Sequence, residues 1–122
     1  MKIDELFSWT FFEEIKPNKK IMEILINGEE VILAYKTLRD IAAITNKRII
    51  IADTQGITGV KVEIFSIPFK SIEMYSTENA GIIDFNAEVK LFTKIGNFKL
   101  KLGRNVDVRK IDRVISSVIL NI

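Results

Sequence analysis

Apolar and polar residues alternate with a period of two through most of this chain, which predicts strands with one buried face. The clearest example begins at Ile83, where every second residue up to Leu91 is apolar and the residues between them are polar. Seven strand-like runs follow one another, at residues 30–37, 41–45, 48–53, 60–67, 71–77, 83–91 and 98–102. Their connections are too short for parallel crossovers, so we expect an antiparallel meander.

Helical spacing replaces this pattern in two places. A short helix is expected from Pro17 to Leu25, because Pro suits a first helical turn and Asn27-Gly28 ends the segment. A second helix is expected from Asp107, with Asn105 or Asp107 as its cap and an apolar stripe of Val108, Ile111, Ile115, Val118 and Ile122. A helix of about 15 residues is marginal alone, so we expect it to cover the apolar mouth of the sheet.

Residues 1–16 form an apolar arm ahead of a single domain at residues 17–122. The arm is crowded with Ile3, Leu6, Phe7, Trp9, Phe11, Phe12 and Ile15. Ile3, Phe7 and Phe11 fall at helical spacing, but the segment Trp9 to Phe12 is poor helix material, so we expect an irregular or briefly helical arm. Packing on its own barrel and packing on a neighbouring subunit both remain open.

The predicted fold is therefore mainly β (α+β). It is a seven-stranded antiparallel bent sheet or partly open barrel, with a short N-terminal helix and a C-terminal amphipathic helix that caps it. A five-stranded oligonucleotide-binding barrel is the alternative, and seven strands with a terminal helix argue against it.

Composition disfavours most enzyme classes. The chain has no His and no Cys among its 122 residues, so it lacks the commonest general base, the thiolate nucleophile and most zinc ligands. We therefore expect no enzymatic activity, no metal and no cofactor. The lack of Cys fits a reducing compartment, and no apolar run suggests a signal peptide or a membrane span, so a cytoplasmic location is expected.

The net charge of +2 is unevenly distributed. Residues 90–122 carry 8 basic and 2 acidic groups, a net of +6, which leaves −4 on the rest of the chain. This polarity suits an acidic partner or a head-to-tail arrangement of identical subunits, although a solvated basic face explains it as well.

A series of short motifs resembles the bacterial pleckstrin-homology (PH) domain family, over about residues 17–120. The motifs are Gly28-Glu29-Glu30, Tyr35-Lys36, Arg39-Asp40, Thr45-Asn46-Lys47-Arg48, Asp53, Gln55-Gly56, Thr58-Gly59, Lys61-Val62-Glu63, Ser66-Ile67-Pro68, Lys70-Ser71-Ile72 and Ala80-Gly81. The resemblance implies a seven-stranded bent barrel with a C-terminal helix, members that often form cyclic homo-oligomers, and no established enzymatic activity.

Two candidate sites follow from these observations. The first is a self-assembly surface in a homo-oligomeric ring, with Phe7, Trp9, Phe11, Phe12 and Phe92 as candidate contacts. The second is a basic face for an acidic membrane surface or a peptide, made of Lys90, Lys94, Lys99, Lys101, Arg109, Lys110 and Arg113. Nucleic acid is not expected, because Phe98 should point into the core and offers no stacking platform.

The segment Thr45-Asn46-Lys47-Arg48 also offers two cations to a ligand. We favour a structural explanation, in which Asn46-Lys47 forms a tight hairpin turn that fixes the register of the flanking strands. Gly56-Ile57-Thr58-Gly59 lacks the Lys and the following helix of a phosphate-binding loop, so a turn is expected there as well.

Overall fold

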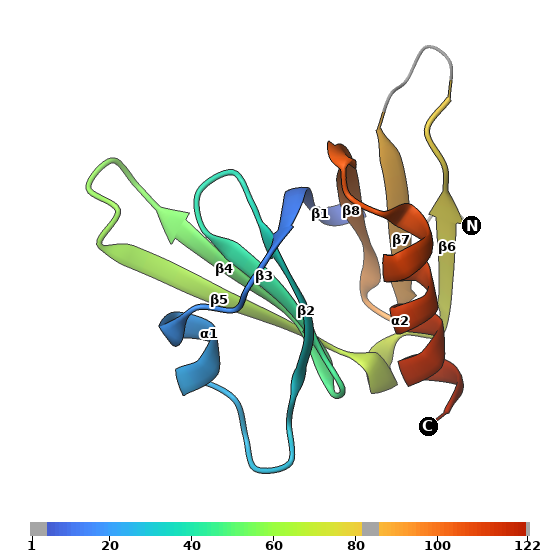
Figure 1. The fold of residues 1–122 in the computed structure, drawn as a ribbon, viewed down its shortest axis with the longest axis horizontal. Helices are drawn as coiled ribbons and strands as arrows, with labels where there is room; N and C mark the ends of the chain where they lie inside the picture. The colour runs from blue at the N-terminus through green and yellow to red at the C-terminus, as the bar shows by residue number, and fades with distance from the viewer. Residues whose placement is uncertain (1–4, 82–85, 122) are drawn as a thin grey trace.

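The computed structural model describes residues 5–81 and 86–121 (Figure 1). Its elements are β1 (Glu5–Ile15), α1 (Lys19–Glu23), β2 (Val31–Lys36), β3 (Ile41–Thr45), β4 (Arg48–Gln55), β5 (Lys61–Pro68), η1 (Phe69–Ser71), β6 (Met74–Glu78), β7 (Ala87–Thr93), β8 (Gly96–Asn105) and α2 (Val108–Leu120). The expectations for Ile3, Ile83, Phe85 and Ile122 lie outside the described residues.

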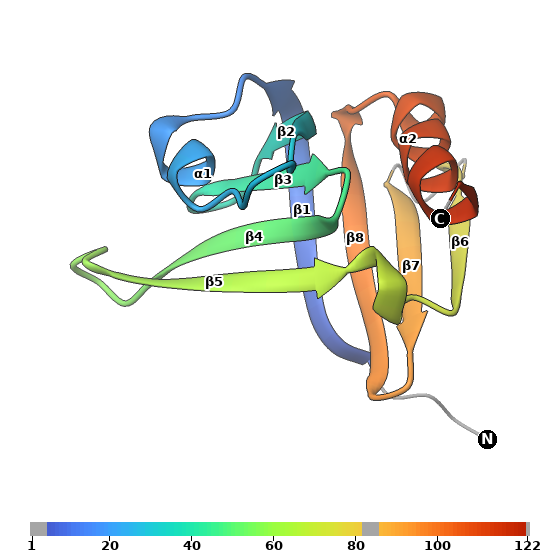
Figure 2. The ribbon, with the colours of Figure 1, turned by 90° about the horizontal axis from the view of Figure 1, so that it is seen from below.

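All the described strands belong to one bent sheet with the order β5-β4-β3-β2-β1-β8-β7-β6. Figure 2 shows β3, β4 and β5 running across the direction of β8, β7 and β6, so the sheet curves into a mainly β half-barrel. The prediction of seven antiparallel strands was wrong on two points. The sheet has eight strands, and β1 pairs parallel with β8 while the other pairs are antiparallel.

β1 is the additional strand, and it forms from the segment that we expected to be irregular or briefly helical. Trp9 lies beside Leu100 of β8, and Phe11 lies beside Leu102. Residues 7, 9 and 11 therefore project toward the concave side of the sheet, where buried residues of β8 already lie. Burying every second residue on the apolar face beside β8 stabilises a strand here. This outweighs the helical spacing of Phe7 and Phe11.

The helix expected at residues 17–25 is reduced to the five residues of α1, which follow a strand, so the described chain has no helix at its N-terminal end. Asn18 caps α1 by accepting a hydrogen bond from the backbone N–H of Ile21 at 3.0 Å. Beyond Glu23 the apolar residues Ile24 and Leu25 continue as an irregular segment that packs on the sheet. A single helical turn suffices to bury Ile21.

The β2–β5 half of the sheet is covered on both faces. One face belongs to the main core, with Leu33, Tyr35 and Ile44 among its residues. The other face packs Ala43 and Ile50 against Ile21 of α1 and its neighbours. Every residue of β3 is therefore buried.

The terminal helix α2 lies over β6, β7 and β8 (Figure 1). Asp107 is its cap and accepts a hydrogen bond from the backbone N–H of Lys110 at 3.1 Å. Ile111 and Ile115 are fully buried in the main core, as the apolar stripe predicted. The hydroxyl of Tyr75 donates to Ser116 at 2.8 Å, and that of Thr77 donates to Asp112 at 2.7 Å, so α2 is also tied to β6 by side chains.

Candidate functional site

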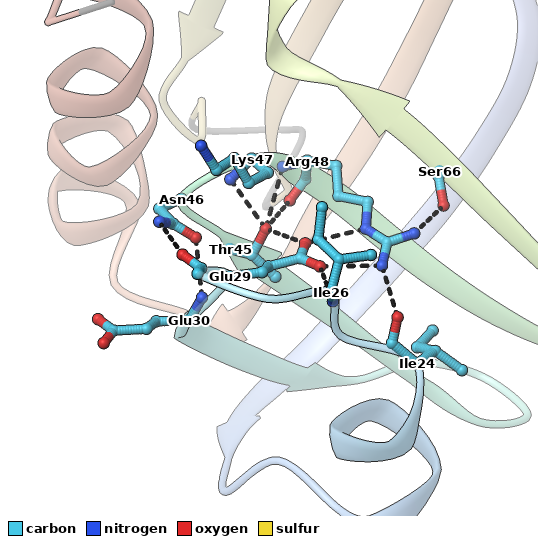
Figure 3. Close-up of polar contacts among 10 residues, drawn as sticks. Ile24, Ile26, Glu29, Glu30, Thr45, Asn46, Lys47, Arg48 and Ser66 are labelled. Carbon is cyan, nitrogen blue, oxygen red and sulfur yellow. Dashed lines mark hydrogen bonds and ion pairs between the residues drawn. The ribbon is translucent and has the colours of Figure 1, made fainter.

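The Thr45–Arg48 turn is the centre of a buried polar cluster (Figure 3). The guanidinium of Arg48 contacts Glu29 twice, from Nε to Oε2 at 2.9 Å and from Nη2 to Oε1 at 3.0 Å. Its remaining donors reach the hydroxyl of Ser66 and the carbonyl of Ile24. The hydroxyl of Thr45 donates to Glu29 Oε2 at 2.7 Å. Arg48 thus joins the segment before β2 to β4 and β5.

The charge of Glu29 is stabilised inside this cluster. Burial alone would raise the pKa of Glu29, but hydrogen bonds from Arg48, Thr45 and the backbone N–H of Ile26, together with the positive charge of Arg48, outweigh burial. The pKa is therefore lowered from 4.5 to about 2. A paired carboxylate of this kind holds a loop in place and has no proton to exchange near neutral pH.

Asn46 completes the cluster on its exposed side. Its side chain accepts from the backbone N–H of Glu30 at 2.8 Å and donates to the carbonyl of Gly28 at 3.0 Å. The turn does not use a positive φ at Asn46, since the only described residues with positive φ are glycines. Instead the hydroxyl of Thr45 accepts from the backbone N–H groups of Lys47 and Arg48. Three of the four residues in this turn therefore serve the fold, which leaves only Lys47 for a ligand.

The five candidate aromatic contacts are divided by the structure. Phe7, Trp9 and Phe12 line one hollow of about 300 Å³ beside β1, and 45% of Phe7 and 41% of Phe12 are exposed. Phe11 is fully buried and stacks on Tyr35 with ring centroids 5.1 Å apart, so it belongs to the core. Phe92 lies half-buried on β7, opposite Met74 and Asn97 of the neighbouring strands.

Two of these rings continue into a larger aromatic group. Phe7 and Trp9 stack with centroids 5.6 Å apart, and both contact Phe65 of β5, at 4.9 Å and 5.2 Å. Phe98 stacks 6.3 Å from each of them. Phe98 is buried in the core, as expected, and the group bridges β1, β5 and β8 across the concave side of the half-barrel.

The candidate basic residues do not form one face. Lys90, Lys99 and Lys101 alternate with buried residues of β7 and β8 that pack in the same core as α2. They therefore lie on the opposite face of the sheet from α2, which carries Arg109, Lys110 and Arg113. Lys94 lies at the β7–β8 turn. Because a sheet and its core separate the two groups, one flat surface cannot contact both.

Several of these cations also have acidic neighbours. Lys110 bonds Glu14 of β1 at 2.8 Å, Lys99 lies 3.9 Å from Glu88, and Lys94 lies 3.9 Å from Glu73. The pairs of Lys94 and Lys110 are exposed and contribute little to stability, whereas the side chains of Lys99 and Glu88 are partly buried. All three pairs reduce the local positive charge.

Two apolar surfaces were not identified from the sequence. The loop Gly56–Val60 between β4 and β5 leaves Ile57 and Val60 almost completely in water, where we expected only a turn. Between the end of β5 and the β7–β8 turn lies a pocket of about 350 Å³, lined in part by Ile67, Ile95 and Phe98. Ile57 between Gly56 and Gly59, with Val60 directly after them, was a visible signal for the first surface. The second depends on the bend of the sheet.

Within the part of the chain that the structure describes, no three metal-binding side chains come together. No helix among those residues is long and apolar enough to cross a membrane.

A half-barrel with this strand order, and with a C-terminal helix over one half of the sheet, has a counterpart among known families. The sequence model of the family described as "Bacterial PH domain" matches residues 2–119. The chain belongs to the bacterial PH domain family. The match includes the β1 segment as well as the motifs from which the resemblance was first inferred.

Two proteins from Bacillus subtilis (strain 168) are similar to this chain in sequence, and both are described as uncharacterized. YjqA is 46% identical over 74 residues, which cover 61% of this chain and 59% of YjqA. YozO is 32% identical over 98 residues, which cover 80% of this chain and 85% of YozO. The family is thus established, and these relatives add no activity to it.

Solved structures agree with this bacterial PH domain fold. A DUF1696 family protein with a pleckstrin-homology domain from Shewanella loihica PV-4 is 34% identical, with a TM-score of 0.78 over 88% of this chain and 96% of that protein. A pleckstrin-homology domain from Shewanella amazonensis SB2B is 39% identical, with a TM-score of 0.65 over 82% of each chain. A PH-domain protein from Exiguobacterium sibiricum 255-15 is 15% identical with a TM-score of 0.65, which shows the fold alone.

Proposed function

We propose that this chain is a non-enzymatic PH-like interaction module whose copies assemble into a closed homo-oligomeric ring. The observation that carries the proposal is the apolar surface that the single chain leaves in water. Phe7 and Phe12 are 45% and 41% exposed beside a hollow, and Ile57 and Ile95 are exposed at two loops. Exposed apolar side chains beside a hollow, as at Phe7 and Phe12, are typical of surfaces that another protein covers.

The sheet offers further contact surface because it does not close. β5 and β6 are its two ends, and each pairs with a single neighbour in the described chain. Open strand edges present unpaired backbone groups that another chain can cover. Repetition of such a contact closes a ring when the rotation between copies permits it.

Binding without catalysis is supported by the composition. The chain has no His and no Cys, and the strongest carboxylate interaction described, that of Glu29, is used in the fold. PH-like domains are generally binding modules. The absence of Cys fits a reducing compartment, so we propose the cytoplasm as the location.

The decisive experiment is the absolute mass in solution, by light scattering after size exclusion, at two salt concentrations and two loadings. We expect a defined multiple of 14.0 kDa that persists at high salt, because apolar contacts are not screened by ions. A monomer at every loading contradicts the ring.

A second candidate function is the binding of an acidic membrane surface or peptide. It is favoured by Lys90, Lys99 and Lys101, which lie on one face of two neighbouring strands, with Lys90 directly opposite Lys99. Each cation near an anionic bilayer contributes about 1 kcal/mol, so three give weak, salt-sensitive binding. Sedimentation with vesicles rich in anionic lipid at low salt tests this function, and the absence of any bound fraction removes it. Arg109 and Arg113 serve as the control pair, because replacing them should leave binding by the sheet face unchanged.

A further inference from the structure

A pocket of about 600 Å³ lies where the β3–β4 turn, η1 and the C-terminal end of α2 meet, and we call it the lysine pocket. Lys47 comes from the turn, Lys70 comes from η1, and Ser117, Val118 and Asn121 come from the end of α2. Figure 1 shows η1, in yellow-green, beside the C-terminal end of α2, and the two elements pack against each other. The pocket is therefore made of three segments that lie far apart in the sequence.

The charged lining of the lysine pocket is basic. Lys47 and Lys70 are both exposed, and no acidic side chain of the described residues lines the pocket with them. In contrast, the pocket between the end of β5 and the β7–β8 turn includes Glu73, and the hollow beside β1 includes Asp53. Neither ammonium group of the lysine pocket has a hydrogen-bond or ion-pair partner among the described residues. An anion that enters it therefore meets two unpaired positive charges.

The backbone fixes the positions from which both lysine side chains extend. The backbone N–H of Phe69 donates to the carbonyl of Lys47 at 3.1 Å, so η1 is tied directly to the β3–β4 turn. The N–H of Lys47 donates to the hydroxyl of Thr45 at 3.0 Å. On the other side of η1, the hydroxyl of Ser71 donates to the carbonyl of Pro68 at 2.7 Å. Because Phe69 is also buried in the main core, little backbone ordering is left for a ligand to impose.

The fold itself makes little use of the two charges. Figure 3 shows the side chain of Lys47 pointing away from Glu29 and Arg48, so the buried polar cluster does not need it. One structural role is available, because cations near the C-terminal end of α2 offset its partial negative charge. That partial charge is about half an elementary charge, whereas two lysines carry two, so the lysine pocket keeps an excess of positive charge.

The charge and size of the lysine pocket indicate the class of its ligand. Two ammonium groups suit a group with two negative charges, and a phosphate monoester carries about −1.5 to −2 charges near pH 7. Asn121, whose side-chain amide is a neutral donor, also lines the pocket. Pro68 and Val118 supply an apolar wall for the organic part of an ester, and the volume is typical of small-molecule sites.

We propose that the lysine pocket binds a phosphate monoester, with the ammonium groups of Lys47 and Lys70 on the phosphate and the organic part against Pro68 and Val118. The site does not depend on assembly, because all these residues come from one chain. A phosphate monoester is the reactive chemistry shared by small soluble esters and by the headgroup of phosphatidic acid, and the experiments distinguish these two sources.

The test is a titration of the full chain with glycerol phosphate at constant ionic strength, followed through the backbone amide signals in NMR. We expect saturable shifts at Lys47, Lys70 and Asn121, and much smaller shifts with dimethyl phosphate, which carries a single charge. Lys47→Gln and Lys70→Gln should each weaken the binding of glycerol phosphate by about three- to tenfold, because each removes one charge-assisted contact.

Lys61→Gln is the matched control for these variants. Lys61 is an exposed lysine at the opposite end of β5 from Pro68, so Lys61→Gln removes the same charge away from the pocket and should bind glycerol phosphate as wild type does. Lys47→Arg keeps the charge and should retain binding. All the substituted side chains are exposed, and a thermal melt verifies that each variant is folded.

Two vesicle preparations distinguish a lipid headgroup from a soluble ester. Phosphatidylcholine vesicles that contain phosphatidic acid display a phosphate monoester, whereas those that contain phosphatidylglycerol at the same charge density display a diester. If the protein sediments with the first and not with the second, and Lys70→Gln prevents this, the ligand is the headgroup. If glycerol phosphate shifts the pocket signals and neither vesicle retains the protein, the ligand is a soluble ester.

Three results overturn the proposal. The absence of saturable shifts at the pocket residues with glycerol phosphate shows that the pocket binds no phosphate monoester. An equal loss of affinity in Lys61→Gln and Lys70→Gln shows a general effect of charge. If Lys47→Gln and Lys70→Gln bind glycerol phosphate as wild type does but melt at a lower temperature, the two lysines only offset the charge at the end of α2.

Discussion

Glu29 and Arg48 are 19 positions apart in the sequence, yet their side chains are joined by two hydrogen bonds. The carboxylate accepts from Arg48, Thr45 and the backbone of Ile26, so each oxygen has a donor. Breaking a buried pair by removing one partner is costly, because the other charge is left uncompensated. The effect of this pair therefore shows best in a variant that keeps the shape and removes the charge.

We predict that Glu29→Gln lowers the free energy of unfolding at pH 7 by about 2–4 kcal/mol. The pKa of Glu29 is about 2 in the folded protein and 4.5 without the fold, so its stabilisation is present above pH 4.5 and is lost as the pH falls toward 2. Urea denaturation at pH 7 and pH 3 should therefore show wild type losing about 2 kcal/mol more than Glu29→Gln. Glu30→Gln, at an exposed neighbouring position, should behave as wild type. Equal pH dependence in all three proteins would contradict the role of Glu29.

Tyr35 is the opposite case at the same scale. Its side chain is 1% exposed, and its hydroxyl has no hydrogen-bond partner among the described residues. Burial, together with the negative charges of Glu14 and Asp107, raises the pKa of the phenol, so the hydroxyl stays neutral. We predict that Tyr35→Phe leaves stability unchanged or increases it by up to about 1 kcal/mol, because no bond is lost and an unsatisfied group is removed. A thermal melt measures this, and a clear loss of stability would indicate a partner for the hydroxyl.

At the scale of elements, α2 is the clearest success of the sequence patterns. Its apolar stripe placed Ile111 and Ile115 in the core, and Asp107 was one of the two caps expected. We predict that Ile115→Ala costs about 2–5 kcal/mol, because it leaves a cavity in a fully buried site. Ser117→Ala on the exposed side of the same helix should change stability by less than about 0.5 kcal/mol. Urea denaturation at one protein concentration measures both values. Similar losses of stability in the two variants would contradict the burial of Ile115 in the core.

β1 was missed for a reason that the sequence itself explains. Phe7, Trp9 and Phe11 fit period two, with Ser8 and Thr10 between them, but they fit helical spacing in part because Phe7 and Phe11 are four residues apart. The parallel partner of β1 is β8, about 90 residues later in the chain, and no local pattern predicts a pairing at that distance. The seven other strands come from hairpins, where neighbours in sequence are neighbours in space.

The candidate sites show the same limit at the scale of the whole molecule. Net charge along the sequence predicted one basic face, but the apolar stripe of α2 packs on the buried face of β7 and β8, so the lysines of the sheet and the cations of the helix are separated. The pocket between the end of β5 and the β7–β8 turn depends on how far the sheet bends. A structural role for Thr45–Arg48 as a turn was predicted, whereas the polar cluster that Arg48 and Thr45 form with Glu29 was not.

At the scale of the whole molecule, β1 is the strand that joins the β2–β5 half to the β6–β8 half in one sheet. Phe11 and Phe12 are adjacent on it and differ only in environment, with Phe11 fully buried and Phe12 41% exposed. We predict that Phe11→Ala lowers the free energy of unfolding by about 3–5 kcal/mol. We also expect a single cooperative transition, since both halves lose the same contact.

Phe12→Ala is the matched control for this change. It should cost less than Phe11→Ala, about 1–2 kcal/mol, because the Phe12 side chain is only partly buried. Urea denaturation followed by Trp9 fluorescence and by circular dichroism measures both variants, and the two probes should give the same midpoint. If the fluorescence and circular dichroism midpoints of Phe11→Ala differ, the two halves of the sheet unfold as independent units. β1 then does not couple them. If Phe11→Ala and Phe12→Ala cost the same, the strand is not held by its buried face.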